Sequence, residues 1–134
     1  TLIGFFSVLT FFGADLEESH FDAVITKFTC AFPTSKVIIS LGLPRIDHID
    51  LESKVEIVNV LIKKAIRIGN CSRVTYCEHS NFKLNGVVKS HLISADGYHL
   101  TNDGTNVLCS NIRFKVESVL GMSTKRYRTN GYSN

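Results

Sequence analysis

Three features that would assign a function class at once are missing from this sequence: an apolar segment of membrane-spanning length, a C-x-x-C pair and a dense basic stripe. Residues 1–14 are largely apolar, but this stretch is shorter than the about 20 residues of a membrane span and lacks the basic flank of a signal peptide. The net charge of +3 is weaker than expected for a dedicated nucleic-acid binder. We therefore expect neither a membrane nor a nucleic acid as partner.

Cysteine usage excludes two further classes. The four cysteines have spacings that match no zinc ribbon and no disulfide framework. Cys71 and Cys77 bracket a predicted strand of about 20 Å, which is too long for a disulfide to bridge, and Cys77 with His79 makes only half of a metal site. We predict free, reduced core thiols at Cys30, Cys71, Cys77 and Cys109, no metal, no cofactor and a cytoplasmic location.

The composition is that of one globular domain, with 44% hydrophobic residues, 20% charged residues and only two prolines. We expect this domain to occupy residues 1–120 and the polar residues 121–134, which include the basic cluster KRYR, to form a disordered tail. The sequence starts without methionine inside a run of strand-forming residues, so we also expect a fragment of a longer domain.

Helical periods recur three times along the chain. Phe21, Val24, Ile25 and Phe28 form the apolar stripe of a first helix, which ends before Pro33. A second helix ends at Gly69-Asn70 and a third begins near Asp103. The inward-facing residues of these two helices are predicted to be Leu51, Val55, Val58, Ile62 and Ala65, and then Val107, Leu108, Ile112 and Val116.

Strand-forming runs separate these helices. Apolar runs at residues 8–12, 36–43 and 73–77 predict strands, the second of them central in the sheet, and residues 78–95 are predicted to be a polar loop. Strands that alternate with helices pair in parallel through crossovers. The order predicts an α/β fold with an open parallel sheet.

The segment SADGYHLTNDGTN places Asp96 and His99 three residues apart in a glycine-bracketed turn before the last helix. At this spacing the carboxylate can accept a hydrogen bond from the ring, which fixes the tautomer and leaves the other ring nitrogen as a general base. The turn should lie beyond the carboxyl ends of the strands, where open α/β sheets bind ligands. An isolated pair of this kind is more often a capped turn with a surface histidine.

The same segment contains residues suited to a tight turn and a helix start. We expect Gly97 and Gly104 to permit turns that a Cβ would resist, and Thr101 or Asn102 to cap the helix. Elsewhere Lys36 and Arg45, at strand ends, could hold an anionic substrate, although basic residues in such places are more often solvated charges.

The segments DGYHLTNDGTNVLCSNIR and FPTSKVIISLGLPR resemble the C-terminal part of the SGNH (GDSL-type) hydrolase family, in particular esterase-like members from animal genomes and mobile elements. The resemblance covers about residues 11–119. It implies a partial flavodoxin-like three-layer αβα sandwich that lacks its first strands. It also implies that Asp96 and His99 are the last two members of a Ser-His-Asp triad acting on a small acyl ester.

The sequence departs from this family in two places. It contains no G-D-S block and no G-x-S-x-G elbow, so the nucleophile would have to lie upstream of Thr1. Gly13 matches the glycine of the family's oxyanion block, but either Asp15 stands where an asparagine is expected or that asparagine has been deleted. An ionised carboxylate cannot donate to an oxyanion. The amides of Asn81 and Asn111 are predicted to have capping or surface roles.

Three hypotheses follow. The chain is the C-terminal part of an SGNH-type ester hydrolase, inactive alone; or a catalytically inert binding module, associated with a retroelement and contacting RNA through its basic tail; or a degenerate gene fragment. Loss of the first strands would also expose the Phe-rich strand at residues 8–12, and we expect self-association through this edge.

Overall fold

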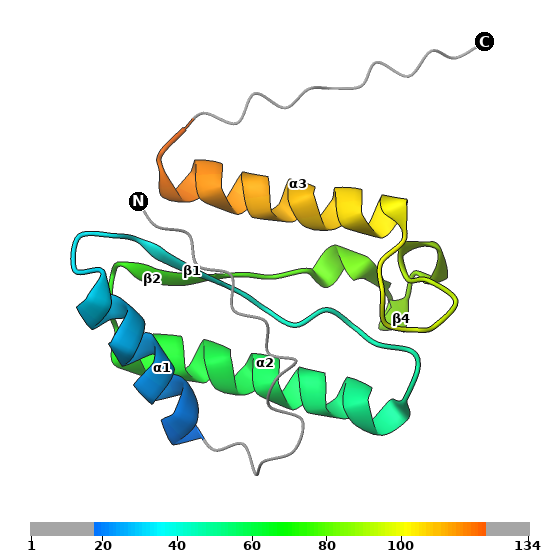
Figure 1. Cartoon of the computed structure of the whole chain (residues 1–134), viewed down its shortest axis with the longest axis horizontal. Coiled ribbons are helices and arrows are strands. Elements are labelled where there is room, and N and C mark those ends of the chain that lie inside the picture. Colours follow the sequence, from blue (N-terminus) through cyan, green and yellow to red (C-terminus); the bar gives the residue numbers. More distant parts are fainter. Residues whose placement is uncertain (1–17, 123–134) are drawn as a thin grey trace.

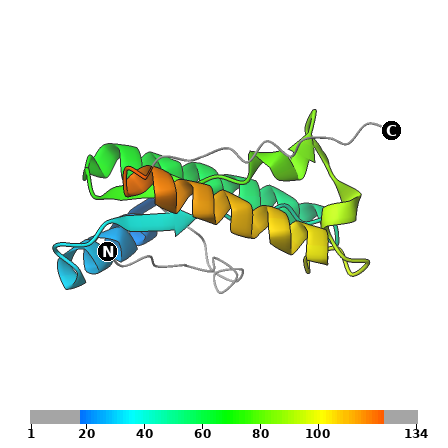
Figure 2. The ribbon, with the colours of Figure 1, turned by 90° about the horizontal axis from the view of Figure 1, so that it is seen from above.

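The computed structural model describes residues 18–122 and shows three layers (Figure 1). The main elements are α1 (Glu18–Ala31), β1 (Val37–Ser40), α2 (Ile49–Gly69), β2 (Val74–Cys77) and α3 (Asn102–Val119). Helices α1 and α2 cover one face of the strands, and α3 lies on the opposite face (Figures 1 and 2). The predicted α/β class and the partial αβα sandwich are therefore confirmed.

In the described part of the chain the main sheet has two strands, which pair in parallel as predicted. Val37 lies opposite Val74, and Ser40 lies opposite Cys77. β1 is shorter than the predicted strand at residues 36–43, because the Asn59 side chain binds both the N–H and the C=O of Gly42 and draws the backbone away from the sheet. The strand predicted at residues 8–12 lies outside the described residues.

One core cluster lies between the strands and the helices α1 and α2. Its buried residues are Phe21, Leu41, Val58, Ile62 and Ala65. The predicted inward stripe of α2 is thus confirmed over most of its length, although Leu51 is only half-buried. The helix ends as expected, with Asn70 at φ 44° in the left-handed conformation that closes a helix.

The prediction of a polar loop at residues 78–95 is wrong, because this segment builds a second core cluster. It contains η2 (Ser80–Phe82), β3 (Lys83–Leu84), β4 (Val87–Val88) and η3 (Ser90–Leu92). Phe82 is completely buried, and Leu92 and Ile93 pack with it. These apolar residues have neither a helical nor a strand period, so the pattern did not reveal their burial.

The N-terminus of α3 is capped as predicted. Thr101 accepts a hydrogen bond from the Gly104 N–H at 3.1 Å. The four residues predicted to face inward from α3 are only half-buried. Gly104 is fully buried within the helix, where an added Cβ would lie 2.0 Å from the Leu92 carbonyl oxygen. The prediction that Gly104 permits a turn is therefore wrong, since the glycine permits close packing instead.

All four cysteines are free, as predicted, but their expected core location holds only in part. Cys77 is buried, and burial raises the pKa of its thiol. Cys71 is half-buried, whereas Cys30 and Cys109 are exposed on helices. Across residues 18–122 there is no group of three or more side chains that could hold a metal ion.

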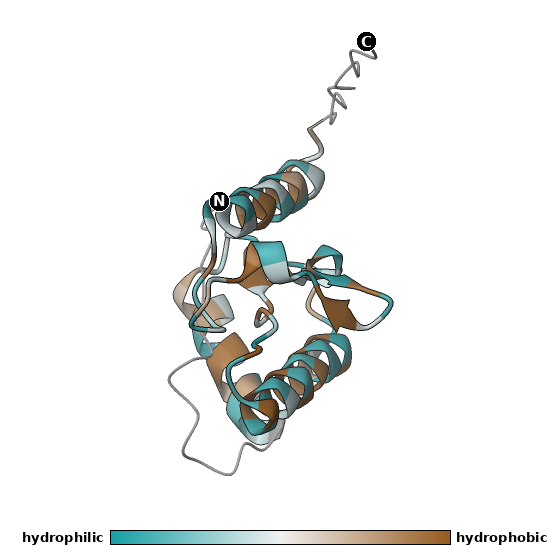
Figure 3. Cartoon of the chain, turned by 90° about the vertical axis from the view of Figure 1, so that its right-hand side faces the viewer, coloured by the Kyte–Doolittle hydropathy of each residue, from teal (hydrophilic) through white to brown (hydrophobic). Residues whose placement is uncertain are grey.

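The helices carry both hydrophilic and hydrophobic residues along their length (Figure 3). None of the helices described between residues 18 and 122 combines the length and the apolar character that crossing a membrane requires.

Candidate active site

The turn at residues 94–100 brings Asp96 and His99 together. Oδ2 of Asp96 lies 2.5 Å from Nδ1 of His99, while Oδ1 accepts backbone N–H groups of Tyr98 and His99 at 3.1 and 3.0 Å. A short antiparallel bridge between Ile93 and Leu100 closes the turn. With Nδ1 bound to Asp96, Nε2 is the ring nitrogen through which His99 would meet a substrate or a nucleophile.

Electrostatics in this turn favour the ionised aspartate. The His99 hydrogen bond, followed by the two backbone N–H bonds, lowers the pKa of Asp96 from 3.8 to about 2. The Asp96 and His99 side chains are 43% and 64% exposed, so the pair is open to solvent and to a ligand. At neutral pH the site presents an ionised carboxylate that fixes the orientation of an accessible imidazole.

The low pKa of Asp96 can be tested directly. We expect its carboxyl group to titrate at about 2 in a carbon-detected NMR experiment. In His99→Ala the pKa should rise toward 3.8, because the largest stabilising contact is lost. The backbone N–H bonds remain in that variant, so the rise should be incomplete. An unchanged pKa in His99→Ala would contradict the observed contact.

The segment after β1 holds the turn in place. The Ile46 N–H donates to the Gly97 carbonyl at 2.8 Å. Gly97 has φ +83°, as expected for a turn glycine, and a Cβ there would lie 2.6 Å from the backbone nitrogen of Asp47. A side chain at position 97 is therefore excluded by both the backbone conformation and the close contact.

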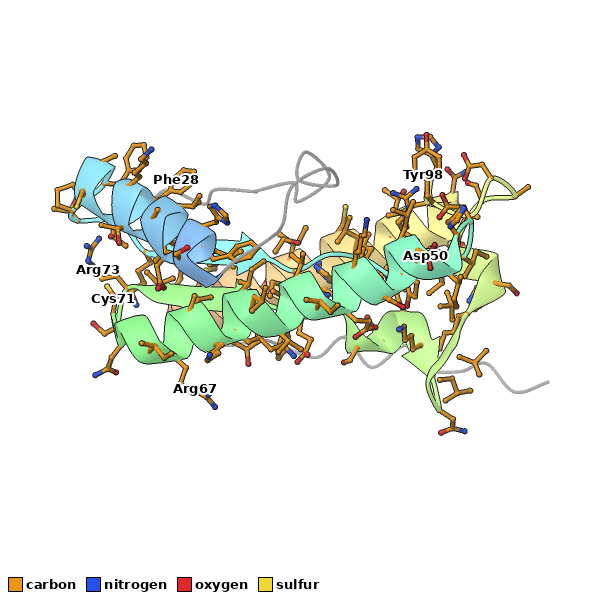
Figure 4. The ribbon with its side chains drawn as sticks, turned by 90° about the horizontal axis from the view of Figure 1, so that it is seen from below. Phe28, Asp50, Arg67, Cys71, Arg73 and Tyr98 are labelled. Carbon is orange, nitrogen blue, oxygen red and sulfur yellow. The ribbon has the colours of Figure 1, made fainter. Side chains whose placement is uncertain are left out.

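Tyr98 and Arg45 extend the site beside His99. The Tyr98 and His99 rings are 4.0 Å apart between centroids, and the Arg45 guanidinium lies 4.9 Å from the Tyr98 centroid. Arg45 also forms two hydrogen bonds with Asp47, at 2.9 and 2.5 Å, which lower the pKa of Asp47. Figure 4 shows Tyr98 at the end of the molecule where α2 begins.

Arg45 is not simply a solvated charge, because its side chain is only 14% exposed, whereas Lys36 is exposed as expected. Arg45 contacts Asp47 and Tyr98, and Nζ of Lys36 donates to the Val119 carbonyl at the end of α3, at 2.9 Å. The pattern did not reveal Tyr98 and Asp47 as neighbours of the site. Tyr98 is adjacent to His99 in sequence, but only the folded loop shows that Arg45 reaches it.

The other residues of the predicted site are the two proposed for the oxyanion hole. Gly13 and Asp15 lie outside the described residues. In the part of the chain that the structure describes, no hydrogen bond joins His99 to a hydroxyl or a thiol. Among the described residues, His99 is thus hydrogen-bonded to Asp96 and to no nucleophilic side chain.

A second polar cluster, which the sequence did not predict, surrounds His79. This histidine is 6% exposed, its Nε2 lies 2.9 Å from Oγ of Ser40, and its Nδ1 lies 3.1 Å from Nδ2 of Asn111. Asn111 and Asn81 exchange two hydrogen bonds of 2.8 Å. Asn81 is exposed, as predicted, whereas Asn111 is half-buried and connects α3 to His79 rather than having a capping or surface role.

In the arrangement of amides shown, these hydrogen bonds do not activate Ser40 as a nucleophile. An amide nitrogen only donates, so Nδ1 of His79 accepts from Asn111 and the ring proton is on Nε2. His79 then donates to the Ser40 hydroxyl oxygen and cannot remove the serine proton. In this arrangement the Ser40–His79 contact joins the end of β1 to the segment after β2.

Buried His79 predicts a loss of stability in mild acid. Burial lowers the pKa of His79 below its ordinary 6.5 in the folded chain. As the pH falls through 6.5, the unfolded chain binds a proton that the folded chain resists, so the free energy of unfolding decreases. We expect urea unfolding monitored by circular dichroism to show lower stability at about pH 5 than at about pH 7.5.

Two variants separate this effect from other titrations. His79→Gln keeps an amide donor for Ser40 but does not titrate, so its stability should change less between the two pH values. His48→Gln alters a histidine whose side chain is 65% exposed, and it should retain the full decrease. Equal pH dependence in the wild type and His79→Gln would refute the assignment to His79.

Comparison with known proteins gives a likeness in structure and none in sequence. No protein-family profile matches the chain, and no curated protein matches it in sequence. Among solved structures it is similar to the esterase domain of the ORF1 protein from the zebrafish ZfL2-1 retrotransposon, with a TM-score of 0.63 and 18% sequence identity. The match covers 75% of this chain and 60% of that domain. At this identity the likeness establishes the fold alone.

Proposed function

We propose that this chain is the C-terminal part of an SGNH-type serine ester hydrolase, in which Asp96 and His99 serve a serine located upstream of Thr1. The observation that carries the proposal is the 2.5 Å contact between Oδ2 of Asp96 and Nδ1 of His99. The fold supports it, because the chain is similar to 60% of an esterase domain. The remaining length of that domain is sufficient for a nucleophile-bearing segment.

The geometry supports a defined sequence of proton transfers. The serine hydroxyl attacks the ester carbonyl, its proton passes to Nε2 of His99, and Asp96 stabilises the imidazolium that forms. His99 then protonates the leaving alkoxide, which departs as an alcohol and leaves an acyl-enzyme. A water molecule, deprotonated by the same nitrogen, hydrolyses this intermediate and releases the carboxylic acid.

The exposed surroundings of His99 fit a small ester. Tyr98, which is 45% exposed, lies against the imidazole and offers an aromatic surface for an acyl or alcohol group. The charge of Arg45 is compensated by Asp47, so the site does not select an anionic substrate. We therefore assign an uncharged acyl ester as the substrate class.

Covalent labelling tests this proposal. The chain would be produced together with the segment that precedes Thr1 and exposed to a fluorophosphonate probe, and p-nitrophenyl acetate hydrolysis would be measured in parallel. We expect hydrolysis, and a label that peptide mass spectrometry locates on a serine upstream of Thr1. The 134-residue chain alone should be neither labelled nor active. A folded longer protein without label and activity would contradict the proposal and favour an inert module, and a label on Ser40 would contradict the assigned nucleophile.

A further inference from the structure

The outer face of α2 carries a row of exposed apolar side chains. Ile49, Ile57, Val60 and Ile68 are 78%, 58%, 61% and 60% exposed. In Figure 4, which views the molecule from below, α2 lies in front of the other described elements. We call these four residues the outer stripe.

The outer stripe runs along the length of α2 and is interrupted by two polar residues, Ser53 and Lys64. With Ser53 and Lys64, its residues recur at intervals of three or four, which places them on one helical face. The buried residues of α2 occupy the opposite face. Single exposed apolar residues are common, but four exposed apolar residues on one face of a single helix are typical of an interaction surface.

We infer that the outer stripe is the interface between two copies of this chain, with their α2 helices packed antiparallel about a two-fold axis. The spacing of the stripe is self-complementary, because the intervals are the same when counted from either end. In an antiparallel pair Ile49 faces the partner's Ile68, and Ile57 faces the partner's Val60. A two-fold interface requires this match between one surface and itself.

The charge distribution of α2 selects the antiparallel arrangement. The first half of the helix contains Asp50, Glu52 and Glu56 with Lys54, and the second half contains Lys63, Lys64 and Arg67 without an acidic residue. Antiparallel packing places each acidic half against a basic half, whereas parallel packing would oppose like charges.

The charges at the two ends of α2 contribute most to this preference. Lys83 contacts Glu52 and Glu56 within the chain, and Lys63 contacts Glu78, so these charges of both halves are already partly compensated. The Asp50 side chain is 78% exposed at one end, and Figure 4 shows Arg67 projecting from the other end. The interface is thus apolar along its centre and oppositely charged at its ends.

One helix from each copy makes a smaller interface than the about 1,600 Å² of standard complexes, so we expect a reversible dimer that forms with rising concentration. Sedimentation equilibrium of the 134-residue chain would measure its dissociation constant.

Val60→Lys should raise this dissociation constant about 100-fold, because two-fold symmetry makes each copy lose an apolar contact worth about tenfold. The control is Phe114→Lys, since Phe114 on α3 is 60% exposed and lies outside the stripe. It should leave the constant unchanged.

A crosslinking experiment tests the helix orientation. In a background with Cys30→Ser and Cys109→Ser, the single variants Ile49→Cys and Ile68→Cys would be oxidised separately and as a mixture. Only the mixture should form disulfide-linked dimers, because two copies of position 49 lie about 28 Å apart in the antiparallel pair.

Three results would overturn the inference. A chain that stays monomeric at all concentrations has no such interface. Crosslinking of Ile49→Cys alone excludes the antiparallel arrangement. Association that survives Val60→Lys but is lost in Phe11→Lys would assign the contact to the apolar N-terminal segment instead.

Discussion

Replacing His99 with alanine is expected to lower kcat/KM for p-nitrophenyl acetate by about 100- to 10,000-fold in the protein that includes the upstream serine. The serine would lose the base that accepts its proton, and the leaving group would lose its proton donor. Steady-state hydrolysis assays on purified wild type and variant measure the effect.

Two control variants distinguish loss of the His99 base from a general effect of substitution. His48→Ala removes a histidine with a 65% exposed side chain, nearly the same exposure as the 64% of His99, and it should retain wild-type activity. Asp96→Asn should reduce activity less than His99→Ala does, because part of the histidine population would still adopt the correct tautomer. Equal activity of His99→Ala and the wild type would exclude His99 as the base.

Replacing Gly104 with alanine is expected to lower the free energy of unfolding by about 3 kcal/mol, the range of severe overpacking. The new Cβ would lie 2.0 Å from the Leu92 carbonyl oxygen, so α3 and η3 would have to separate. The same carbonyl accepts the Thr101 N–H at 3.1 Å, and this hydrogen bond closes the loop that carries Asp96 and His99. Urea unfolding gives the loss of stability, and the Asp96 pKa reports damage to the turn.

The matched control is Gly69→Ala. Gly69 is the last residue of α2, and an added Cβ there would meet nothing within 4 Å. Alanine favours the helix over glycine, so this variant should keep or slightly raise the stability, by up to about 1 kcal/mol. If Gly104→Ala were as stable as Gly69→Ala, the close approach of α3 to Leu92 would be disproved.

The local elements were predictable because their signals are contained in a few neighbouring residues. Apolar periodicity identified α1 and the buried face of α2, and apolar runs identified β1 and β2 with their parallel pairing. The contact between Asp96 and His99 was also predictable, because the two residues are only three positions apart in one turn. These features depend on short-range geometry, which composition and spacing encode directly.

Contacts between distant segments could not be read from the pattern. Phe82 and Leu92 have no periodicity, yet both are buried, because the loop folds back under α3. The sequence singled out Gly104 as a glycine with a role, but only the packed structure shows that it accommodates a carbonyl from another segment.

The sequence by itself thus determined the α/β class, the order of the elements, and the pairing of Asp96 with His99. The tertiary structure alone decided the neighbours of that pair, Arg45 and Tyr98, and the burial of His79 between Ser40 and Asn111. Residues 39 and 32 positions apart meet at His79. Such contacts depend on how whole elements pack, and packing is a property of the assembled core rather than of any short segment.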